Sequence, residues 1–233
     1  MAKHKNKNKN GFKKTILFLV IIIILVIFGV ALNGYSMYKA AVDHISIDDK
    51  INEIRNKENY INISDVSNDY LNATIAVEDH RFYSHFGFDP IATMNALFDN
   101  VLSGSFVGRG GSTITQQLAK NMYFEQDKKF SRKIAELIVA FQLEQKLEKD
   151  EILELYINII YFGDGYYGIK EASEGYFQKN PENLTFDEAI LVAGLPSAPS
   201  VYSPTVNERL ANERKEQVRS AMIKHGYIEN SND

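Results

Sequence analysis

Acidic residues at two places in this 233-residue chain could take part in acid–base chemistry. One is the adjacent pair Glu78 and Asp79, and the other is Glu136. Adjacent residues on a helix point about 100° apart, so Glu78 and Asp79 cannot both face one reacting bond. One of them could act as a general base while the other anchors the structure. The preceding residues, LNATIAV (71–77), are mostly apolar and predict that Glu78 ends a buried helix at a cleft wall. The alternative is a solvated acidic helix end, which the pair taken alone would favour.

Uncharged hydrogen-bonding side chains gather at a second predicted helix start, which follows the glycine-rich segment GSFVGRGGST (104–113). A helix N-terminus presents free backbone N–H groups and favours anionic oxygens. The hydroxyl and amide groups there suit sugar hydroxyls, N-acetyl groups or phosphate: Ser112, Thr113, Gln116 and Gln117. The segment is not a nucleotide-binding phosphate loop, because the Gly-Lys-Ser/Thr ending is absent. A capped helix whose glutamines meet solvent is the alternative.

A group of cations follows these polar residues. Lys120 lies four residues after Gln116, one turn further along the same helix face. Four more basic residues fall within six positions: Lys128, Lys129, Arg132 and Lys133. The cluster could meet an anionic substrate, or it could be a solvated charge run, which is the usual fate of such clusters.

The charge of the whole chain makes this cluster stand out. Formal net charge is −4, but the first 14 residues carry six lysines and no acid. The remainder therefore holds 20 basic against 30 acidic residues. A mostly acidic domain is a poor general nucleic-acid binder, because binding by counterion release needs positive charge. We predict no nucleic-acid partner.

The sequence offers no clear site for a metal or an organic cofactor. The chain contains no cysteine, which excludes disulfides and thiolate metal sites. His80 and His85 form no metal-ligand set. His85 could be a ligand, but a histidine that braces its own loop is the better interpretation. We expect no organic cofactor and no metal held by protein ligands.

One segment has the composition of a membrane span. Ile16 to Leu32 is a run of 17 residues without a polar or charged side chain. At about 1.5 Å rise per residue it covers roughly 25 Å, enough to cross a bilayer core with slight thinning. The preceding lysines place the N-terminus in the cytoplasm and everything after Asn33 outside, in a single-pass cell-membrane protein. A cleaved signal peptide, or a buried core helix, is the alternative.

The remaining sequence predicts one all-α domain. Helix start and stop signals recur from Ser64 on, and the alternation of apolar and polar residues that is typical of strands is scarce. We expect about eight helices. Predicted helix starts carry N-capping patterns, at Asp89-Pro90, Thr113-x-x-Gln116 and Thr185-x-x-Glu188. The last predicted helix runs from about Asn207 to His225. The predicted organisation is a basic tail (1–14), a transmembrane helix (15–33), a stalk or linker (34–63), the folded domain (64–228) and a disordered tail (229–233).

Four sequence blocks, in this order and at these spacings, resemble the peptidoglycan glycosyltransferases of glycosyltransferase family 51. The blocks are EDHRFYSHFGFDP (78–90), GSTITQQLAKN (111–121), RKIAELIVAFQLE (132–144) and ILELYINIIYFG (152–163). GLPSAPSVYSP (194–204) resembles the closing motif of the family, so the likeness covers about residues 64–205. It implies a lysozyme-like all-α fold with a smaller membrane-facing lobe. Phe98, Val101, Leu102, Phe106 and Val107 could form the lipid-contacting surface of that lobe, or pack internally.

The resemblance also implies roles for individual residues. It makes Glu78 the catalytic base and Glu136 the second essential glutamate; a plain ion pair between Glu136 and Arg132 at i, i+4 is the structural alternative. It assigns Lys120 and Lys128 to donor pyrophosphate binding, although some family members carry Arg at the latter position. The complete set expected to bind substrate is Asp79, Ser112, Thr113, Gln116, Gln117, Lys120, Asn121, Lys128, Arg132 and Lys133.

The function implied by the resemblance is polymerisation of lipid II into β-1,4-linked glycan strands, with inversion at the donor anomeric carbon and release of the lipid pyrophosphate. Mg²⁺ or Mn²⁺ could assist the pyrophosphate. Expected partners are lipid II, the growing glycan strand, the bacterial plasma membrane and cell-wall synthesis proteins. A monofunctional enzyme is expected, because only SMYK (36–39) matches Ser-x-x-Lys and no Lys-Thr-Gly occurs. A lysozyme-like hydrolase and a non-catalytic anchored scaffold are the alternatives.

Overall fold

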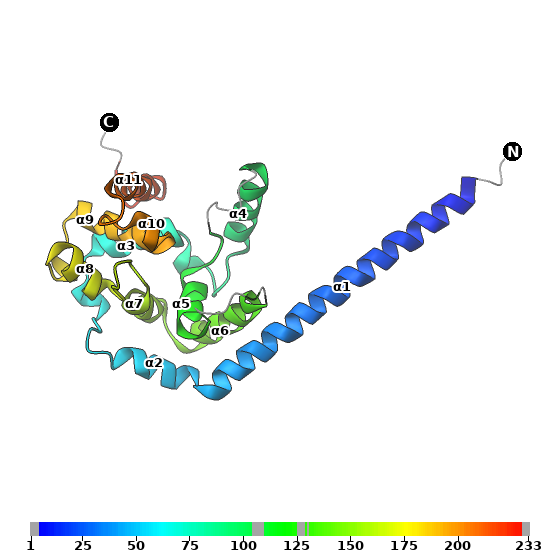
Figure 1. The fold of residues 1–233 in the computed structure, drawn as a ribbon, viewed down its shortest axis with the longest axis horizontal. Coiled ribbons are helices and arrows are strands. Elements are labelled where there is room, and N and C mark those ends of the chain that lie inside the picture. Colours follow the sequence, from blue (N-terminus) through cyan, green and yellow to red (C-terminus); the bar gives the residue numbers. More distant parts are fainter. Residues whose placement is uncertain (1–4, 104–109, 125–128, 130, 230–233) are drawn as a thin grey trace.

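The chain folds almost entirely into helices. A computed structural model describes residues 5–103, 110–124, 129 and 131–229 (Figure 1). No strand occurs within these residues, only one isolated bridge between Tyr161 and Tyr167, so the predicted all-α class is confirmed. The described helices are α1 (Lys5–His44), α2 (Ile47–Arg55), α3 (Asn68–Glu78), α4 (Pro90–Ser103), α5 (Ile114–Tyr123), α6 (Arg132–Lys146), α7 (Lys149–Ile159), α8 (Ile169–Phe177), α9 (Phe186–Gly194), α10 (Pro199–Tyr202) and α11 (Glu208–Lys224).

The predicted capping patterns lie at real helix starts. Thr113 and Thr185 close capping boxes with Gln116 and Glu188 at the starts of α5 and α9. Asp89 accepts a 2.8 Å hydrogen bond from the amide of Ala92 and so caps α4. Side-chain caps satisfy N–H groups that a helix cannot bond internally. These three helix starts were therefore predictable from local chemistry.

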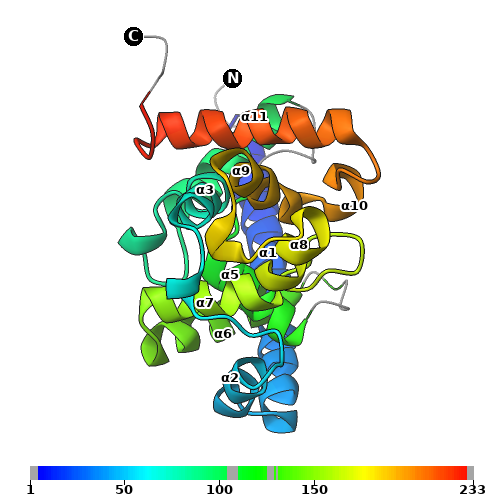
Figure 2. The ribbon, with the colours of Figure 1, turned by 90° about the vertical axis from the view of Figure 1, so that its left-hand side faces the viewer.

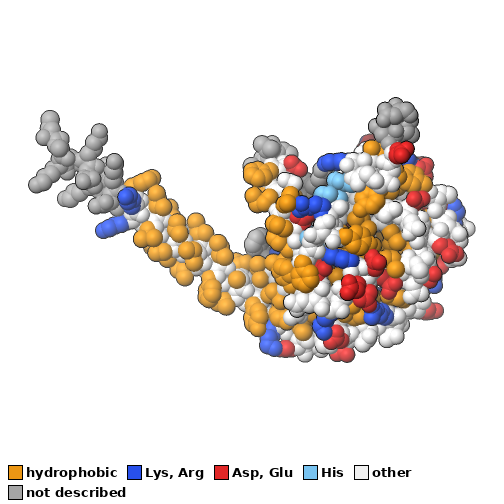
Figure 3. All heavy atoms as spheres, turned by 180° about the vertical axis from the view of Figure 1, so that it is seen from behind, with side chains coloured by type: hydrophobic (Ala, Val, Ile, Leu, Met, Phe, Trp, Pro, Cys, Tyr) orange, Lys and Arg blue, Asp and Glu red, His pale blue; other side chains and the backbone are white. Residues whose placement is uncertain are grey.

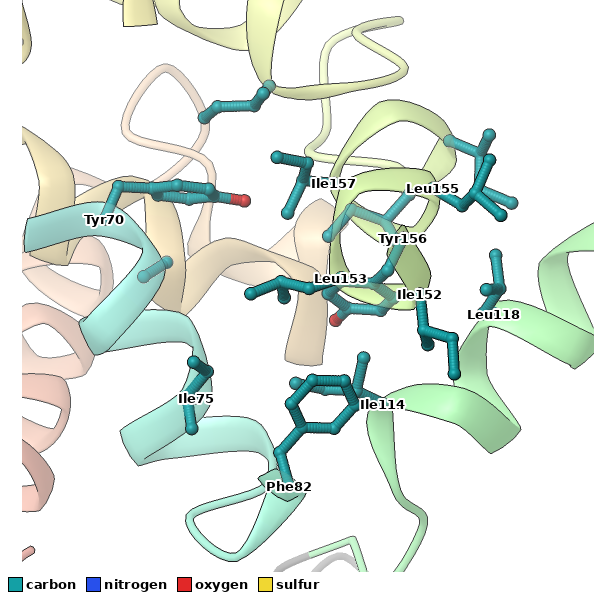
Figure 4. Packing of buried hydrophobic residues seen from close by; sticks show 14 of the residues in the cluster. Tyr70, Ile75, Phe82, Ile114, Leu118, Ile152, Leu153, Leu155, Tyr156 and Ile157 are labelled. Atoms are coloured by element: carbon teal, nitrogen blue, oxygen red, sulfur yellow. The ribbon is translucent and has the colours of Figure 1, made fainter. Parts of the chain in front are cut away.

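Helix α7 is the centre of the core. Seven of its residues are buried, namely 152, 153 and 155–159, and Glu154 between them is half-buried. Figure 4 shows that Ile152 and Tyr156 of α7 lie close to Ile114 of α5 and to Phe82. Helices α5 and α6 pack on one another, as do α3, α9 and α11. Figure 2 shows α11 lying across α3 and α9. The end of α3 and the start of α5 thus meet above this core.

Helix α1 is a single long rod that leaves the helical body (Figures 1 and 3). Its segment Phe12–His44 has a mean hydropathy of 3.4 over its most apolar window, and none of that window is buried in the protein. By length and composition this helix can cross a membrane. The predicted apolar helix near the N-terminus is therefore present.

The structure differs from the predicted stalk over residues 34–63. Residues 34–44 continue α1, and residues 47–55 form α2, whose Ile47, Ile51 and Ile54 belong to the hydrophobic core. Ser46 caps α2 by accepting a 3.1 Å hydrogen bond from the amide of Asp49. The apolar spacing i, i+4, i+7 of a buried face was present, but the polar composition of the segment concealed it.

The segment after α2 is also fixed to the core, by polar side chains of α7. Asn158 accepts a 2.9 Å hydrogen bond from the amide of Ile61 and donates one of 2.9 Å to its carbonyl. Glu154 accepts from the amide of Ile63 at 2.8 Å and from the hydroxyl of Tyr60. These contacts make residues 60–63 part of the folded domain rather than a free linker.

Helix α4 carries an apolar face that the described part of the protein does not cover. Ile91, Met94, Leu97 and Phe98 are 49–59% exposed, and their spacing places them on one side of the helix. Phe98, for which internal packing was one expectation, is therefore not packed internally. Phe106 and Val107 lie outside the described residues, as do the side chains of Val101 and Leu102.

The part of α1 that follows its apolar segment is fixed to α6 and to the residue before it. Ser131 donates a 2.6 Å hydrogen bond to Asn33, and Gln142 donates one of 2.7 Å to the hydroxyl of Tyr38. A Cβ on Gly34 would lie 2.4 Å from the Cβ of Ile134 and 2.8 Å from the carbonyl oxygen of Ser131. Only glycine allows the two helices to come this close.

Replacing Gly34 by leucine should therefore force α1 away from α6. Overpacking of this kind costs about 1–3 kcal/mol, so we expect the midpoint of thermal unfolding to fall by about 2–10 °C. The matched control is Gly29→Leu in the same helix, where an added Cβ meets nothing within 4 Å. Thermal unfolding of the detergent-solubilised full chain measures both variants. Equal midpoints for Gly34→Leu and Gly29→Leu would contradict the contact.

Candidate active site

Glu78 is the last residue of α3, and both of its carboxylate oxygens are held. Oε2 accepts a 2.9 Å hydrogen bond from Nε2 of Gln117 on α5. Oε1 accepts one of 3.0 Å from the hydroxyl of Ser197, and Nη2 of Arg214 lies 3.8 Å from the same oxygen. The Glu78 side chain is 11% exposed. Side chains from three separate segments thus orient a carboxylate that still reaches the surface.

The neighbouring Asp79 has a different environment. It is 5% exposed, and Nε2 of His85 lies 2.9 and 3.0 Å from its two oxygens. One of these oxygens also accepts a 3.0 Å hydrogen bond from the backbone amide of Ile114, at the start of α5. Asp79 is therefore the anchor of the pair. Its predicted contact with substrate gains no support, because protein groups already occupy its oxygens; His85 braces the loop, as expected.

The residues at the start of α5 are divided between capping and the site. The side chains of Thr113 and Gln116 bond to each other's backbone amides at 3.1 and 3.0 Å, and Thr113 also donates to the carbonyl of Gly87 at 2.8 Å. Both side chains are buried. These bonds hold the helix start; the contact with substrate predicted for Thr113 and Gln116 stays a prediction.

The side chain of Gln117, by contrast, contacts Glu78. Its amide oxygen is 3.3 Å from the hydroxyl of Tyr156, which donates to it. Burial, together with the nearby Glu78 carboxylate, raises the pKa of Tyr156 well above its usual range. Tyr156 is therefore a neutral donor that fixes which end of the Gln117 amide points to Glu78.

Glu136 lies beneath two cations rather than facing open space. Its side chain is fully buried; Nε of Arg132 is 3.2 Å from one oxygen and Nζ of Lys133 is 2.8 Å from the other. Lys133 also donates a 2.8 Å hydrogen bond to Ser112. The ion pair predicted between Glu136 and Arg132 is thus present. Glu136 was expected to present a second carboxylate across a cleft from Glu78. In the structure its carboxylate is instead covered by the cations at positions i−4 and i−3.

Lys120 is half-buried on α5, three residues beyond Gln117 and so on the same side of the helix. Its ammonium group forms no hydrogen bond or ion pair with a side chain that the structure describes. Asn121 is also half-buried. Lys128, for which pyrophosphate binding was predicted, lies outside the described residues. The site therefore combines one carboxylate, Glu78 at the end of α3, with the ammonium group of Lys120, one turn along α5 from the Gln117 side chain that holds Glu78.

Three contacts of the site could not be found in the sequence motifs. Arg214 lies beyond the blocks that carried the family resemblance, and Ser197 lies within the closing block without a signal of its own. Glu144 is the third: its Oε1 accepts from the amide of Gly87 at 2.9 Å, from Thr115 at 2.6 Å and from Lys149 at 2.7 Å. Except for the pair of Glu144 with Lys149, these contacts join segments that are far apart in the chain.

No group of three or more His, Cys, Asp or Glu side chains in the described ranges could hold a metal ion. A divalent cation would therefore have to be bound largely by the substrate's own phosphates. The use of Mg²⁺ or Mn²⁺ stays a prediction.

A family model described as Transglycosylase matches residues 47–223 of the chain. The chain belongs to the transglycosylase family. The match begins at α2 and ends within α11, so it includes Arg214 and residues 47–63 of the segment predicted to be a stalk. Family membership thus extends over the elements that complete the site.

The relatives found by sequence are penicillin-binding proteins. Penicillin-binding protein 1F of Bacillus subtilis is 39% identical over 234 residues, which cover 93% of this chain and 32% of the relative. Penicillin-binding protein 1A of Neisseria gonorrhoeae is 45% identical over 172 residues, covering 74% of this chain and 21% of the relative. The corresponding protein of Aquifex aeolicus is 42% identical, with 74% and 24% covered. The chain thus spans between about a fifth and a third of the length of these relatives.

Among solved structures, penicillin-binding protein 1A from Haemophilus influenzae matches with a TM-score of 0.41 and 22% sequence identity. The match covers 73% of this chain and 16% of that one.

Because Glu144 accepts three hydrogen bonds at one oxygen, its loss should destabilise the fold. Glu144→Ala leaves the partly buried Lys149 without its counter-charge, and breaking a buried pair costs about 3–5 kcal/mol. Gln145→Ala, at the exposed neighbouring position, is the control and should stay within about 0.5 kcal/mol of wild type. Urea unfolding followed by circular dichroism measures both. A Glu144→Ala midpoint equal to that of the control would refute the structural role of this carboxylate.

Proposed function

We propose that this chain is a membrane-anchored peptidoglycan glycosyltransferase that polymerises lipid II into β-1,4-linked glycan strands, with inversion at the donor anomeric carbon. One observation carries the proposal: Glu78 is hydrogen-bonded to Gln117 on α5 at 2.9 Å, and Lys120 follows one turn along that helix. One helix, α5, thereby holds the carboxylate base through Gln117 and carries a cation for an anionic leaving group. Membership of the transglycosylase family supports it.

The chemistry needs both groups. The donor leaves as a lipid pyrophosphate, which requires charge neutralisation more than it requires a proton. Lys120, Lys128, Arg132 and Lys133 would supply that charge. The 4-hydroxyl of the acceptor sugar is a weak nucleophile, and Glu78 would remove its proton as the bond to the anomeric carbon forms. Attack from the face opposite the leaving group inverts an α-linked donor to a β-linked product, by the logic of inverting glycosidases.

Glu136 would act on this chemistry through the cations. Its buried carboxylate contacts Arg132 at 3.2 Å and Lys133 at 2.8 Å, and the three groups together carry one net positive charge. Buried carboxylates hold Arg and Lys heads in fixed positions. Orientation of the cations, rather than direct stabilisation of an oxocarbenium-like centre, is the role that these contacts favour.

The membrane completes the proposal. The lysine-rich N-terminus would stay in the cytoplasm, α1 would cross the bilayer, and the helical domain would lie outside the cell. The substrate's lipid remains in the bilayer, and the apolar side chains of α4 would contact it there; hydrophobic side chains gather on this projecting part in Figure 3. A hydrolase acting on neutral glycan would use Glu78 but would leave the cations without a role.

Glu78→Gln should abolish polymerisation, because an amide keeps the size of the side chain but cannot accept the proton. General-base catalysis contributes about 10²–10⁴-fold, and we expect a loss in that range. The test is incubation of the detergent-purified full chain with labelled lipid II, separating products by length. Glu58→Gln, at an exposed position, is the control. No polymer from wild type would refute the function; polymer from Glu78→Gln at the wild-type rate would refute the base alone.

Lys120→Ala should impair use of the donor by removing a charge from the leaving-group site. We expect kcat/KM for lipid II to fall by about 10–100-fold, which corresponds to loss of one charge-assisted contact. Inhibition by inorganic pyrophosphate should weaken in parallel. Lys57→Ala, on the exposed segment after α2, should change neither value. If inorganic pyrophosphate inhibits Lys120→Ala as strongly as it inhibits wild type, Lys120 does not bind the donor pyrophosphate.

A further inference from the structure

Arg214, on the C-terminal helix α11, reaches the candidate base from the side opposite α5. Its Nη2 donates a hydrogen bond to the hydroxyl of Ser197 and lies 3.8 Å from Oε1 of Glu78. The Ser197 hydroxyl in turn donates to that same oxygen at 3.0 Å. The Arg214 side chain is 15% exposed, so this charge is largely shielded from water. Cation, hydroxyl and carboxylate form a short chain.

The position of Arg214 is itself fixed. Its Nε donates a 3.1 Å hydrogen bond to the carbonyl of Gly194, at the end of α9, and its guanidinium lies 5.6 Å from the centre of the Tyr202 ring. A Cβ on Gly194 would come within 2.8 Å of the Arg214 Cγ, so the glycine leaves space for the stem. Nη1 donates to Gln217 at 3.1 Å. A side chain held at this many points has lost its freedom before substrate arrives.

The other groups around Glu78 do not supply this charge. Gln117 is neutral. Burial raises the pKa of the Tyr70 phenol and of the Tyr156 phenol above the usual range, so both stay neutral. Asp79 is paired with His85. Within the described residues, Arg214 is the cation at ion-pair distance from Glu78.

We propose that Arg214, acting through Ser197, is a positioning residue that keeps Glu78 aimed for proton abstraction; this rests on the proposed function. Because the hydroxyl of Ser197 makes the direct contact, the guanidinium does not take both carboxylate oxygens in a bidentate pair. Oε2 keeps a free lone pair beside Gln117, with which it can accept the proton of the acceptor hydroxyl.

A purely structural role makes a different prediction. Arg214 also connects α11 to the end of α9, so its removal lowers stability under either account. A positioning role lowers kcat while KM for lipid II stays nearly constant, because the acceptor and donor contacts remain. Returning a positive charge should then restore part of the rate, although lysine lacks the planar fork of arginine.

The experiment compares four variants of the detergent-purified full chain: Arg214→Met, Arg214→Lys, Ser197→Ala and Arg219→Met. Arg219 is the matched control, since it lies on the same helix, pairs with Asp187 at 2.6 Å and lies over the Phe186 ring. We expect Arg214→Met to lower kcat by at least about 10-fold with KM within about twofold, and Arg214→Lys to recover part of the loss. Ser197→Ala, at an exposed position, should lower kcat by about 3–10-fold without unfolding the protein.

The outcomes separate this inference from the proposed function. Wild-type polymer together with unchanged kcat in Ser197→Ala and in folded Arg214→Met would overturn the positioning role alone. An equal loss of kcat in Arg219→Met, following the loss of thermal stability, would overturn it in favour of a structural role. No polymer from wild type would overturn both. If Arg214→Met fails to fold, Ser197→Ala and Arg214→Lys decide the question.

Discussion

The site depends on one junction, where the carboxylate of Asp79 meets the start of α5. The backbone of Asp79 leaves the helical region (φ −158°, ψ 71°) directly after Glu78, so the two neighbouring side chains diverge. Asp79 then accepts the backbone amide of Ile114, one of the N–H groups that α5 cannot satisfy internally. A negative charge at a helix N-terminus is also favoured by the helix dipole. The junction sets the register of α5 against α3, and that register brings Gln117 opposite Glu78.

The cations depend on a second constraint, which begins in the long apolar helix α1. Ser131, which precedes α6, bonds to Asn33 of α1 at 2.6 Å, and Gly34 leaves no space for a side chain at the same crossing. Arg132 and Lys133 are the next residues along the chain. Their heads are held from the other side by the buried Glu136. A buried carboxylate is costly unless it is paired, so the ion pairs and the helix crossing support each other. Helix α1 and the cations Arg132 and Lys133 therefore form one structural unit.

Features that depend on neighbouring residues could be predicted from the sequence. Contacts between residues far apart in the chain could not. The three helix caps, the apolar first helix and the ion pair of Arg132 with Glu136 involve residues within four positions of each other or one continuous run. Such signals survive in a single sequence. The contact between Ser197 and Glu78 spans 119 positions and that between Gly87 and Glu144 spans 57. No periodicity encodes these, and the burial of α2 was missed because its apolar face is short and surrounded by polar residues.

The two adjacent carboxylates also explain why the site needs elements from beyond the motif blocks. Like charges on neighbouring residues in a partly buried place each need separate compensation. Asp79 takes its compensation from a backbone amide and from His85, groups within or beside the blocks. Glu78 must remain open on one side to act on a substrate, so it cannot be enclosed in the same way. A charge held behind a hydroxyl stabilises it without covering it, and α11, packed on α3, is the helix that can deliver that charge. On this reasoning the C-terminal helix belongs to the active site as much as the helices that carry the motifs.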